Sequence, residues 1–288
     1  MEYGVLGGTG LRVSHLGFGG APVGLRNYLR AYDPTDAGTR DEVTQAIRLA
    51  YDRGVNYFDT APGYGDGESE AIFGEALSGV DPKRYVLATK TGWNDVKPGD
   101  MRRQVENSLK RLGRDYIDVL QFHGSSYPYQ AALGMLSPGG LAEQMHALKR
   151  EGLIRHTGFT TEDNNDAVYM FIRSGLFDVM QTCYNFLFQH PHEPNRPFGS
   201  ILEAKKAGMG VTAMRPTTSG VFQKWMKQIQ PENDFDYTPA LIQFALSNPH
   251  IDVVLVGMRT PGRVAANVGL CEDSSGRVDI AEFSKYYV

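Results

Sequence analysis

Residues 54–77 read GVNYFDTAPGYGDGESEAIFGEAL, and this stretch decides the fold. It begins as an apolar run of the strand type and continues, beyond a turn, as a segment with helical character. At the join lie Asp59 and Tyr64, with Pro62 and Gly63 between them. Pro and Gly are turn residues, so the stretch predicts a buried strand that ends in a carboxylate and turns sharply toward a tyrosine.

Strand-like apolar runs of this kind recur along the chain, and each is followed by a loop and a helix-like segment. They are mostly continuous rather than alternating, which indicates strands covered on both faces. The predicted strands are residues 13–19, 55–60, 85–90, 116–123, 154–160, 179–185, 210–215 and 252–257. The predicted amphipathic helices, which end at Gly or before Pro, include residues 40–54, 99–113, 139–152, 196–208 and 239–249.

Eight strands that alternate with helices predict a closed parallel (β/α)8 barrel, for which about 250 residues is typical. An open, doubly wound sheet is the alternative, but no G-x-G-x-x-G run follows the first strand and opens a helix. The opening EYGVLGGTGLRVSHLGFG, residues 2–19, predicts a β-hairpin that closes the bottom of the barrel. We therefore expect a single α/β barrel domain over residues 1–288.

Composition narrows the class of protein. The net charge of −4 gives no basic surface for nucleic acid or anionic lipid. The sequence shows no leader pattern and no apolar stretch of membrane-spanning length, and its two cysteines, Cys183 and Cys271, lack metal-ligand spacing. His190 and His192 lack a nearby third ligand, so no metal site is expected. The prediction is a cytoplasmic protein whose partner is a small molecule, with the oligomeric state left open.

Polar residues end three successive predicted strands: Asp59, Lys90 and His123, with Tyr64 just beyond the first. Neighbouring strands lie ~4.8 Å apart, so these side chains can meet. A lysine beside a tyrosine favours the phenolate and lowers a pKa that is ordinarily about 10, and a carboxylate keeps the buried lysine charged. A neutral histidine can orient a carbonyl oxygen. The set therefore predicts Tyr64 as a general acid and base in a hydride-transfer reaction.

Four segments carry a resemblance to a known family: residues 6–19, 54–77, 108–123 and 252–268. Together they resemble the aldo-keto reductases, in the same order and over nearly the whole chain. The resemblance implies the barrel and a catalytic tetrad formed by Asp59, Tyr64, Lys90 and His123. It also implies a nicotinamide cofactor, NADP(H) in preference to NAD(H), held without metal. The expected reaction is reduction of an aldehyde or ketone, or oxidation of a sugar or alcohol.

The resemblance also assigns residues to the nicotinamide end of the cofactor. Thr160 and Gln181 match the positions that hold the carboxamide, and Thr161 stands where the family usually has asparagine. Met214 stands where a tyrosine commonly stacks on the ring, and a thioether can also pack there. Arg215 follows it and is expected to meet the phosphates or a charged substrate.

At the adenosine end, Arg263 matches the arginine that binds the 2′-phosphate, and Asn267 matches the asparagine that binds adenine. Arg259 is a second candidate for the phosphate, near an expected helix N-terminus. Gly257 stands where many members have lysine, and Ala266 where many have an acid. The full expected cofactor set is Gly20, Ala21, Thr160, Gln181, Met214, Arg215, Pro216, Thr217, Gly257, Met258, Arg259, Thr260, Arg263 and Asn267.

Long loops follow several strands and are expected to build the substrate pocket. They are residues 20–39, 124–139 and 216–236. Trp93, Tyr127 and Phe188 lie just after strands and predict an apolar or sugar-stacking wall. Gly124 replaces a tryptophan that many family members have at this position, which is expected to open the site.

The sequence leaves two alternative functions open. Barrels host Schiff-base lysines, and Lys90 ends a strand, so a lyase or isomerase is one alternative. The other is a non-catalytic subunit that senses the cofactor, since family members can serve as regulatory chains.

Overall fold

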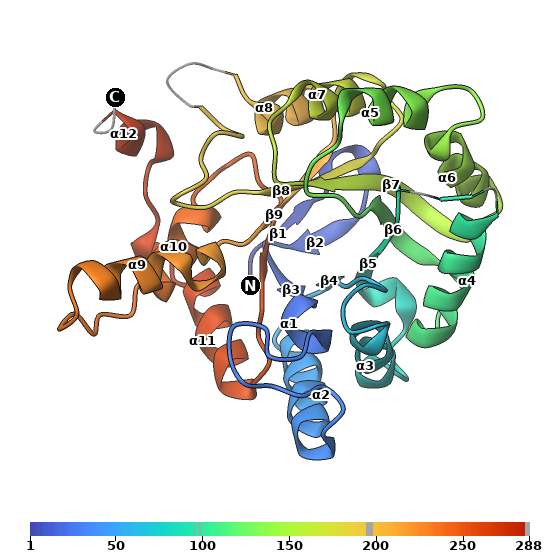
Figure 1. The fold of residues 1–288 in the computed structure, drawn as a ribbon. Coiled ribbons are helices and arrows are strands. Elements are labelled where there is room, and N and C mark those ends of the chain that lie inside the picture. The colour runs from blue at the N-terminus through green and yellow to red at the C-terminus, as the bar shows by residue number, and fades with distance from the viewer. Residues whose placement is uncertain (95, 98, 194–197, 286–288) are drawn as a thin grey trace.

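The computed structural model describes residues 1–94, 96–97, 99–193 and 198–285, and it confirms the (β/α)8 barrel (Figure 1). Eight parallel strands close in the order β10-β3-β4-β5-β6-β7-β8-β9. The barrel strands are β3 Leu16–Gly19, β4 Tyr57–Asp59, β5 Val86–Thr91, β6 Ile117–Phe122, β7 Ile154–Thr161, β8 Val179–Cys183, β9 Gly210–Met214 and β10 Val253–Val256. Because all eight are parallel, their carboxyl ends meet at one mouth.

Helices surround the strands on the outside of the barrel (Figure 1). They are α1 Ala21–Gly24, α2 Ala37–Asp52, α3 Glu68–Ala76, α4 Asp100–Leu112, α5 Tyr129–Leu136, α6 Leu141–Arg150, α7 Asp166–Arg173, α8 Ser200–Lys206, α9 Val221–Ile229, α10 Thr238–Leu246, α11 Pro261–Glu272 and α12 Ile280–Ser284. Short 3-10 turns are η1 Gly7–Thr9, η2 Pro82–Arg84, η3 Thr218–Gly220 and η4 Ser274–Gly276.

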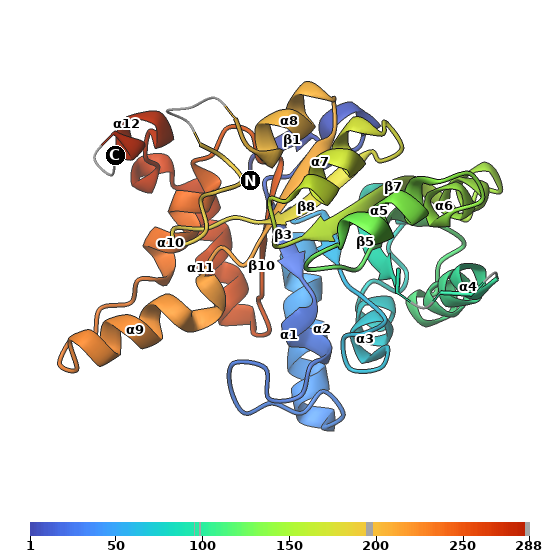
Figure 2. The ribbon, with the colours of Figure 1, turned by 45° about the horizontal axis from the view of Figure 1, so that its top comes forward.

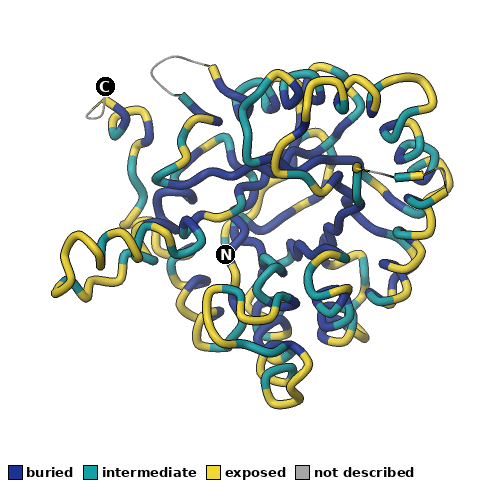
Figure 3. The backbone as a smooth tube through the Cα atoms, viewed as in Figure 1, coloured by how far each residue is buried: buried dark blue, intermediate teal, exposed yellow. Residues whose placement is uncertain are grey.

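The strands are buried on both faces, as their continuous apolar sequences predict (Figure 3). Every residue of β5 and β6 is buried, because one face packs against the helices and the other fills the barrel. The outer layer is the larger apolar cluster, in which strand residues such as Phe18 and Phe58 meet Phe73 of α3. A rigid scaffold of this kind fixes the strand ends that carry the polar side chains.

A β-hairpin closes the lower end of the barrel, as predicted. It pairs β1 Tyr3–Val5 with antiparallel β2 Arg12–Ser14. Its residues Leu6, Leu11 and Val13 form one buried cluster with inward-facing strand residues, among them Val119 and Val253. The predicted strand 13–19 is divided in two, because its first residues pair within the hairpin and the rest enter the barrel as β3.

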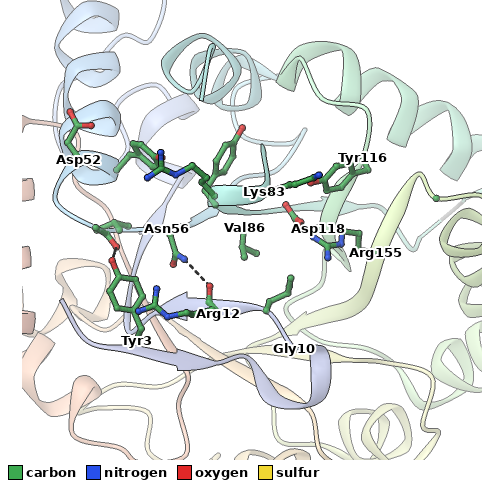
Figure 4. A pocket seen from close by; sticks show the side chains of 17 residues that line it. Tyr3, Gly10, Arg12, Asp52, Asn56, Lys83, Val86, Tyr116, Asp118 and Arg155 are labelled. Carbon is green, nitrogen blue, oxygen red and sulfur yellow. Dashed lines mark hydrogen bonds and ion pairs between the residues drawn. The ribbon is translucent and has the colours of Figure 1, made fainter. Parts of the chain in front are cut away.

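A cavity of about 1190 Å³ lies at this lower end, between the hairpin and the amino ends of the barrel strands (Figure 4). Arg12 covers the Tyr3 ring at 3.9 Å and accepts a bond on its carbonyl from Asn56. Asp118 and Arg155 form an ion pair of 3.1 Å on the far side. These residues start the strands, whereas the predicted tetrad ends them, so this cavity is separate from the predicted chemistry.

All three predicted loops contain helices, and α1 lies in the segment 20–39. The segment 124–139 holds α5, and the segment 216–236 holds α9, which projects from the barrel in both ribbon views (Figures 1 and 2). Val221, Trp225 and Ile229 recur every four residues and define one apolar side of α9, yet all three are exposed.

Candidate active site

The centre of the site is a buried ion pair. Asp59 is the last residue of β4 and Lys90 lies in β5, and the register places the two strands side by side. Lys90 Nζ donates to Asp59 Oδ1 at 2.7 Å and to the Thr60 carbonyl at 2.7 Å. Both side chains are almost fully buried. A buried cation of this kind is tolerated because a carboxylate and a second oxygen satisfy it.

Tyr64 lies above this pair because of a tight turn after β4. Tyr64 donates its amide to Ala61, and its carbonyl accepts from Ser69 at the start of α3. Gly65 follows with φ of 71°, and a Cβ there would lie 2.1 Å from the Gly24 carbonyl oxygen, so only glycine fits. The turn leaves Lys90 Nζ 4.9 Å from the centroid of the Tyr64 ring.

His123 completes the group from the end of β6. Its ring meets the Tyr64 ring edge to face, with centroids 5.5 Å apart and planes at 87°. The ring is open to the mouth of the barrel, yet the surrounding walls desolvate it. Desolvation and the nearby Lys90 ammonium lower the pKa of His123 to about 4. The imidazole is therefore neutral near pH 7, as the sequence predicts for a group that orients a carbonyl.

The pKa values within the tetrad follow from burial and charge. Burial works against the Lys90 ammonium, but Asp59 and Tyr64 together outweigh it and raise the pKa of Lys90. Burial raises the pKa of Asp59, with Lys90 opposing. Burial also raises the pKa of Tyr64, and the Lys90 ammonium only partly opposes it. The expectation that lysine lowers the phenol below its ordinary value is therefore wrong for the protein alone, although the direction of the lysine effect is right.

A raised pKa also bears on the lyase alternative for Lys90. An amine that attacks a carbonyl must be neutral, and enzymes reach that state by lowering the lysine pKa. Lys90 is shifted the other way and its ammonium is already held by two oxygen acceptors. The arrangement favours a permanent charge over a nucleophile.

Gln121 is a site residue that the sequence analysis did not predict. Its Nε2 donates to Asp59 Oδ2 at 3.3 Å and to Gln181 Oε1 at 3.1 Å, so it links the ion pair to the predicted carboxamide site. Gln181 in turn contacts the Met214 sulfur at 3.7 Å. The signal was available, because Gln121 lies two residues before His123 and strand side chains alternate, which places both on one face.

These residues lie in a cavity of about 990 Å³ at the carboxyl ends of the strands. All four tetrad residues line it. From the expected cofactor set it is lined by Gly20, Ala21, Thr160, Gln181, Met214, Arg215, Pro216, Thr217, Gly257, Arg259, Thr260, Arg263 and Asn267. Met258 is the exception, because its side chain is fully buried in the core. Thr161 is also buried, and its hydroxyl donates to the backbone carbonyls of Ser125 and Asp163.

One end of the cavity is built from β10 and the start of α11. The Thr260 side chain caps α11 by accepting from the Arg263 amide, and the helix N-terminus favours anions. The Arg259 guanidinium lies 4.1 Å from the centroid of the Tyr32 ring. Its Nη1 is buried and has no hydrogen-bond partner among the described residues. A buried donor without an acceptor costs about 1–3 kcal/mol, so this atom is poised for an anionic ligand.

The other end of the cavity is polar. Arg215 pairs with Glu162 at 2.8 Å, and the Ser125 hydroxyl donates to the same carboxylate oxygen at 2.9 Å. Arg215 has a left-handed φ of 59°, and its carbonyl accepts from Asn185. Strained backbone of this kind is held only where surrounding contacts fix it, and it gathers at functional sites.

The three predicted substrate-wall residues do not line the cavity. Tyr127 is 1% exposed, and its hydroxyl donates to the backbone carbonyls of Phe122 and Thr160. Trp93 packs on the Tyr127 ring, with centroids 5.1 Å apart, and Phe188 is exposed. Tyr127 also explains Gly124, because a Cβ at Gly124 would lie 2.4 Å from the tyrosine ring.

The part of the chain that the structure describes meets neither the requirements of a metal site nor those of a membrane-spanning helix. There, no group of three or more His, Cys, Asp or Glu side chains could hold a metal ion. No described helix combines the length and the apolar character needed to cross a bilayer.

Comparison with known proteins gives the class of this protein. The sequence profile of the Aldo/keto reductase family matches residues 15–285. The chain therefore belongs to that family, and it is an oxidoreductase of carbonyl compounds in the general sense that the family defines.

Individual relatives agree with this assignment. The chain is 39% identical to the aldo-keto reductase YhdN of Bacillus subtilis, over 92% of this chain and 87% of that protein. It is 28% identical to L-galactose dehydrogenase of Arabidopsis thaliana, over 93% and 87% of the two chains. A solved aldo-keto reductase of Klebsiella pneumoniae in complex with NADPH has the same fold, with a TM-score of 0.74 at 20% identity, covering 99% of this chain and 94% of that one.

Proposed function

We propose that the protein is an NADP(H)-dependent oxidoreductase that reduces an aldehyde or ketone, with Tyr64 as the proton donor and Asp59, Lys90 and His123 as its partners. The observation that carries the proposal is the buried Asp59–Lys90 pair beneath Tyr64, with His123 beside the ring. Packing alone gives no reason to place a half-buried tyrosine of the cavity wall above a buried ion pair, but acid catalysis needs both.

The cavity fits a nicotinamide dinucleotide. Thr160, Gln181 and Met214 lie at the end near the tetrad and would hold the nicotinamide. Arg259 and Arg263 lie at the other end, and the unpartnered buried Nη1 of Arg259 suits a phosphate oxygen. When bound, the cofactor supplies the hydride. The two arginines favour NADP(H) over NAD(H), because only NADP(H) carries a 2′-phosphate on the adenosine ribose.

The tetrad residues divide the proton chemistry among them. Asp59 keeps Lys90 charged, and Lys90 opposes the effect of burial on the Tyr64 phenol. The neutral His123 ring stands across from Tyr64 and orients the carbonyl oxygen between them. Tyr64 then gives its proton to that oxygen in reduction and takes it back in oxidation. Acid catalysis of this kind contributes about 10² to 10⁴ in rate.

We further propose that the substrate is a hydroxylated aldehyde or ketone, such as a sugar. The polar side chains beside His123 are Ser125, Glu162 and Arg215, which offer donors and acceptors to hydroxyl groups. Two relatives support this class by their names, L-galactose dehydrogenase of Arabidopsis thaliana and D-threo-aldose 1-dehydrogenase of a Pseudomonas species, the latter 26% identical over 90% of this chain.

The test is a Tyr64→Phe variant followed by NADPH consumption with a panel of carbonyls and sugars. Loss of the donor is expected to lower kcat at least ~100-fold and leave NADPH binding intact. Tyr129→Phe is the control, because Tyr129 is exposed at the start of α5, and it is expected to match the wild type. Near-normal turnover of Tyr64→Phe would refute the role of Tyr64.

The same panel separates the two alternatives. A wild-type protein that binds NADPH but turns over nothing would favour the cofactor-sensing subunit. Borohydride capture of a substrate on Lys90, without consumption of NADPH, would favour the Schiff-base lyase.

A further inference from the structure

Three arginines converge on the adenosine end of the cavity: Arg30, Arg259 and Arg263. Among the described residues, none of the three guanidinium groups has a hydrogen bond or an ion pair. Arg215, at the opposite end of the same cavity, is by contrast paired with Glu162. Three like charges gathered without partners destabilise one another, so their arrangement indicates an anion that belongs between them.

Arg30 belongs to none of the sequence segments that mark the cofactor site, and a closed loop places it there. The Asn27 amide donates to the Tyr32 carbonyl at 2.9 Å, and the Tyr32 amide donates to the Asn27 side chain at 3.0 Å. These two bonds close residues 28–31 into a compact turn that carries Arg30. Leu29 beside it has a left-handed φ of 66°, which shows how tight the turn is.

The same tyrosine anchors Arg259. The guanidinium of Arg259 stacks on the Tyr32 ring, and the Tyr32 hydroxyl donates to the Val23 carbonyl at 2.6 Å. Tyr32 therefore fixes the loop of Arg30 and the side chain of Arg259 against each other. A second contact across the cavity, between the Tyr28 and Ser219 hydroxyls at 3.4 Å, holds the loop toward η3.

The charges around the cluster leave a positive excess. Burial lowers the pKa of Arg259, and the charge of Arg30 lowers it further. Tyr32 and the nearby carboxylate of Glu42 act in the opposite direction and raise that pKa. Asp236 is the acid near the other two arginines, and its pKa is lowered by hydrogen bonds to Thr238 and then by Arg263 and Arg30. The three arginines exceed these two acids by one positive charge, which favours binding of a phosphate group.

We propose that Arg30 is a third binding residue for the 2′-phosphate of NADP(H), together with Arg259 and Arg263. This inference rests on the proposed function. Gly257, just after β10, leaves the site without the lysine that the resemblance leads one to expect there, and Arg30 supplies a cation from the loop between α1 and α2. Because the cation comes from a loop rather than from the strand, specificity for NADP(H) is set by a segment outside the family motif.

The experiment measures binding of two probes by calorimetry, adenosine 2′,5′-bisphosphate and adenosine 5′-monophosphate. They differ by the 2′-phosphate and do not reach the tetrad. Arg30→Ala is expected to weaken binding of the bisphosphate about three- to tenfold and to leave the monophosphate unchanged. Arg26→Ala is the matched control, because Arg26 lies in the same loop, is 60% exposed and pairs with Asp33 at 2.6 Å.

A second variant is expected to change binding of the bisphosphate in the opposite direction. Asp236→Asn removes the acid near Arg30 and Arg263 but keeps an oxygen for the Thr238 amide, which Asp236 accepts at 2.9 Å. It is expected to tighten bisphosphate binding about two- to fivefold. The selectivity for the bisphosphate should also fall less steeply with salt in Arg30→Ala than in the wild type.

The outcomes separate this inference from the proposed function. If the wild type prefers the bisphosphate and Arg30→Ala keeps the full preference, Arg30 has no role and the inference fails while the cofactor proposal stands. If the wild type binds both probes equally, both this inference and the proposed preference for NADP(H) fail. Tighter binding by Asp236→Asn together with weaker binding by Arg30→Ala supports the inference.

Discussion

The buried Asp59–Lys90 pair can be tested directly by removing one charge at a time. Asp59→Asn keeps the shape of the side chain and an oxygen near Lys90 Nζ, but it removes the counter-charge that now lies 2.7 Å away. The ammonium keeps the Thr60 carbonyl as an acceptor. Breaking a buried pair from one side costs about 3–5 kcal/mol. Because an acceptor remains, we expect a loss near 3 kcal/mol in the free energy of unfolding.

Lys90→Met completes a double-mutant cycle with Asp59→Asn. The methionine fills similar volume and leaves Asp59 buried without its cation. The double variant removes both charges, so it should lose about 2–3 kcal/mol less than the sum of the two single variants. Urea unfolding followed by circular dichroism at neutral pH measures all four proteins. Strictly additive losses would show that the two side chains do not stabilise each other and would contradict the geometry of the site.

The free energies of unfolding of the two single variants should also change with pH in opposite directions. In Asp59→Asn, burial without a counter-charge depresses the pKa of Lys90 below its ordinary value of about 10.4, so stability is lost as the pH falls from about 10 toward 7. In Lys90→Met, burial alone raises the pKa of Asp59 further above its ordinary value of about 3.9. Its stability is therefore present at acid pH and lost as the pH rises from about 4 toward 7.

Three further predictions concern the rim of the cavity. Because the pKa of His123 is about 4, the rate of reduction should show no histidine inflection between about pH 5 and 8, as pH profiles of kcat/KM can check. Gly124→Ala should lower stability by about 1–3 kcal/mol in thermal unfolding, since its Cβ would meet the Tyr127 ring, and Tyr127→Leu should restore part of the loss. Glu162→Gln breaks the exposed pair with Arg215, so it should change stability by under about 1 kcal/mol but raise KM for a hydroxylated aldehyde more than for a simple one.

The parts of the fold that the sequence predicted correctly depend on local signals. The predicted strand 55–60 begins two residues before β4 and ends one residue after it, and the strand is predictable because an apolar run stops at a Pro- and Gly-containing turn. The placement of Asp59, Lys90 and His123 at one mouth then followed from the parallel barrel alone, since parallel strands bring their carboxyl ends together. Gln121 was missed although the same alternation predicts it.

The parts that failed depend on packing between segments that are distant in sequence. Tyr127 was predicted as a cavity wall, but its hydroxyl finds two backbone acceptors and its ring fills the space beside Gly124, so it turns inward. Nothing in the local sequence reveals those acceptors. Arg30 lies in the predicted pocket loop 20–39, but no motif there assigns it to the cofactor, and only the closure of that loop on Tyr32 brings it to the cavity.

The pKa of Tyr64 shows the same limit and leads to a last prediction. The sequence supplies the lysine that favours the phenolate, but burial depends on the closed barrel, and burial raises the pKa of Tyr64 above its ordinary value of about 10. A phenol with a raised pKa keeps its proton through neutral and mildly alkaline pH. If Tyr64 is the donor, reduction should therefore stay constant from about pH 7 to 9, while oxidation, which needs the phenolate, should rise over the same range.

Initial rates in both directions, with the chemical step shown to be limiting by a deuterated cofactor, measure this asymmetry. The His123 ring cannot produce it, because it is already neutral above about pH 5. Lys90 cannot produce it either, because its pKa is raised and its charge persists over the range. A reduction rate that falls between about pH 7 and 9 would mean that the donor titrates there, and the balance of burial and charge argued for Tyr64 would then be incorrect.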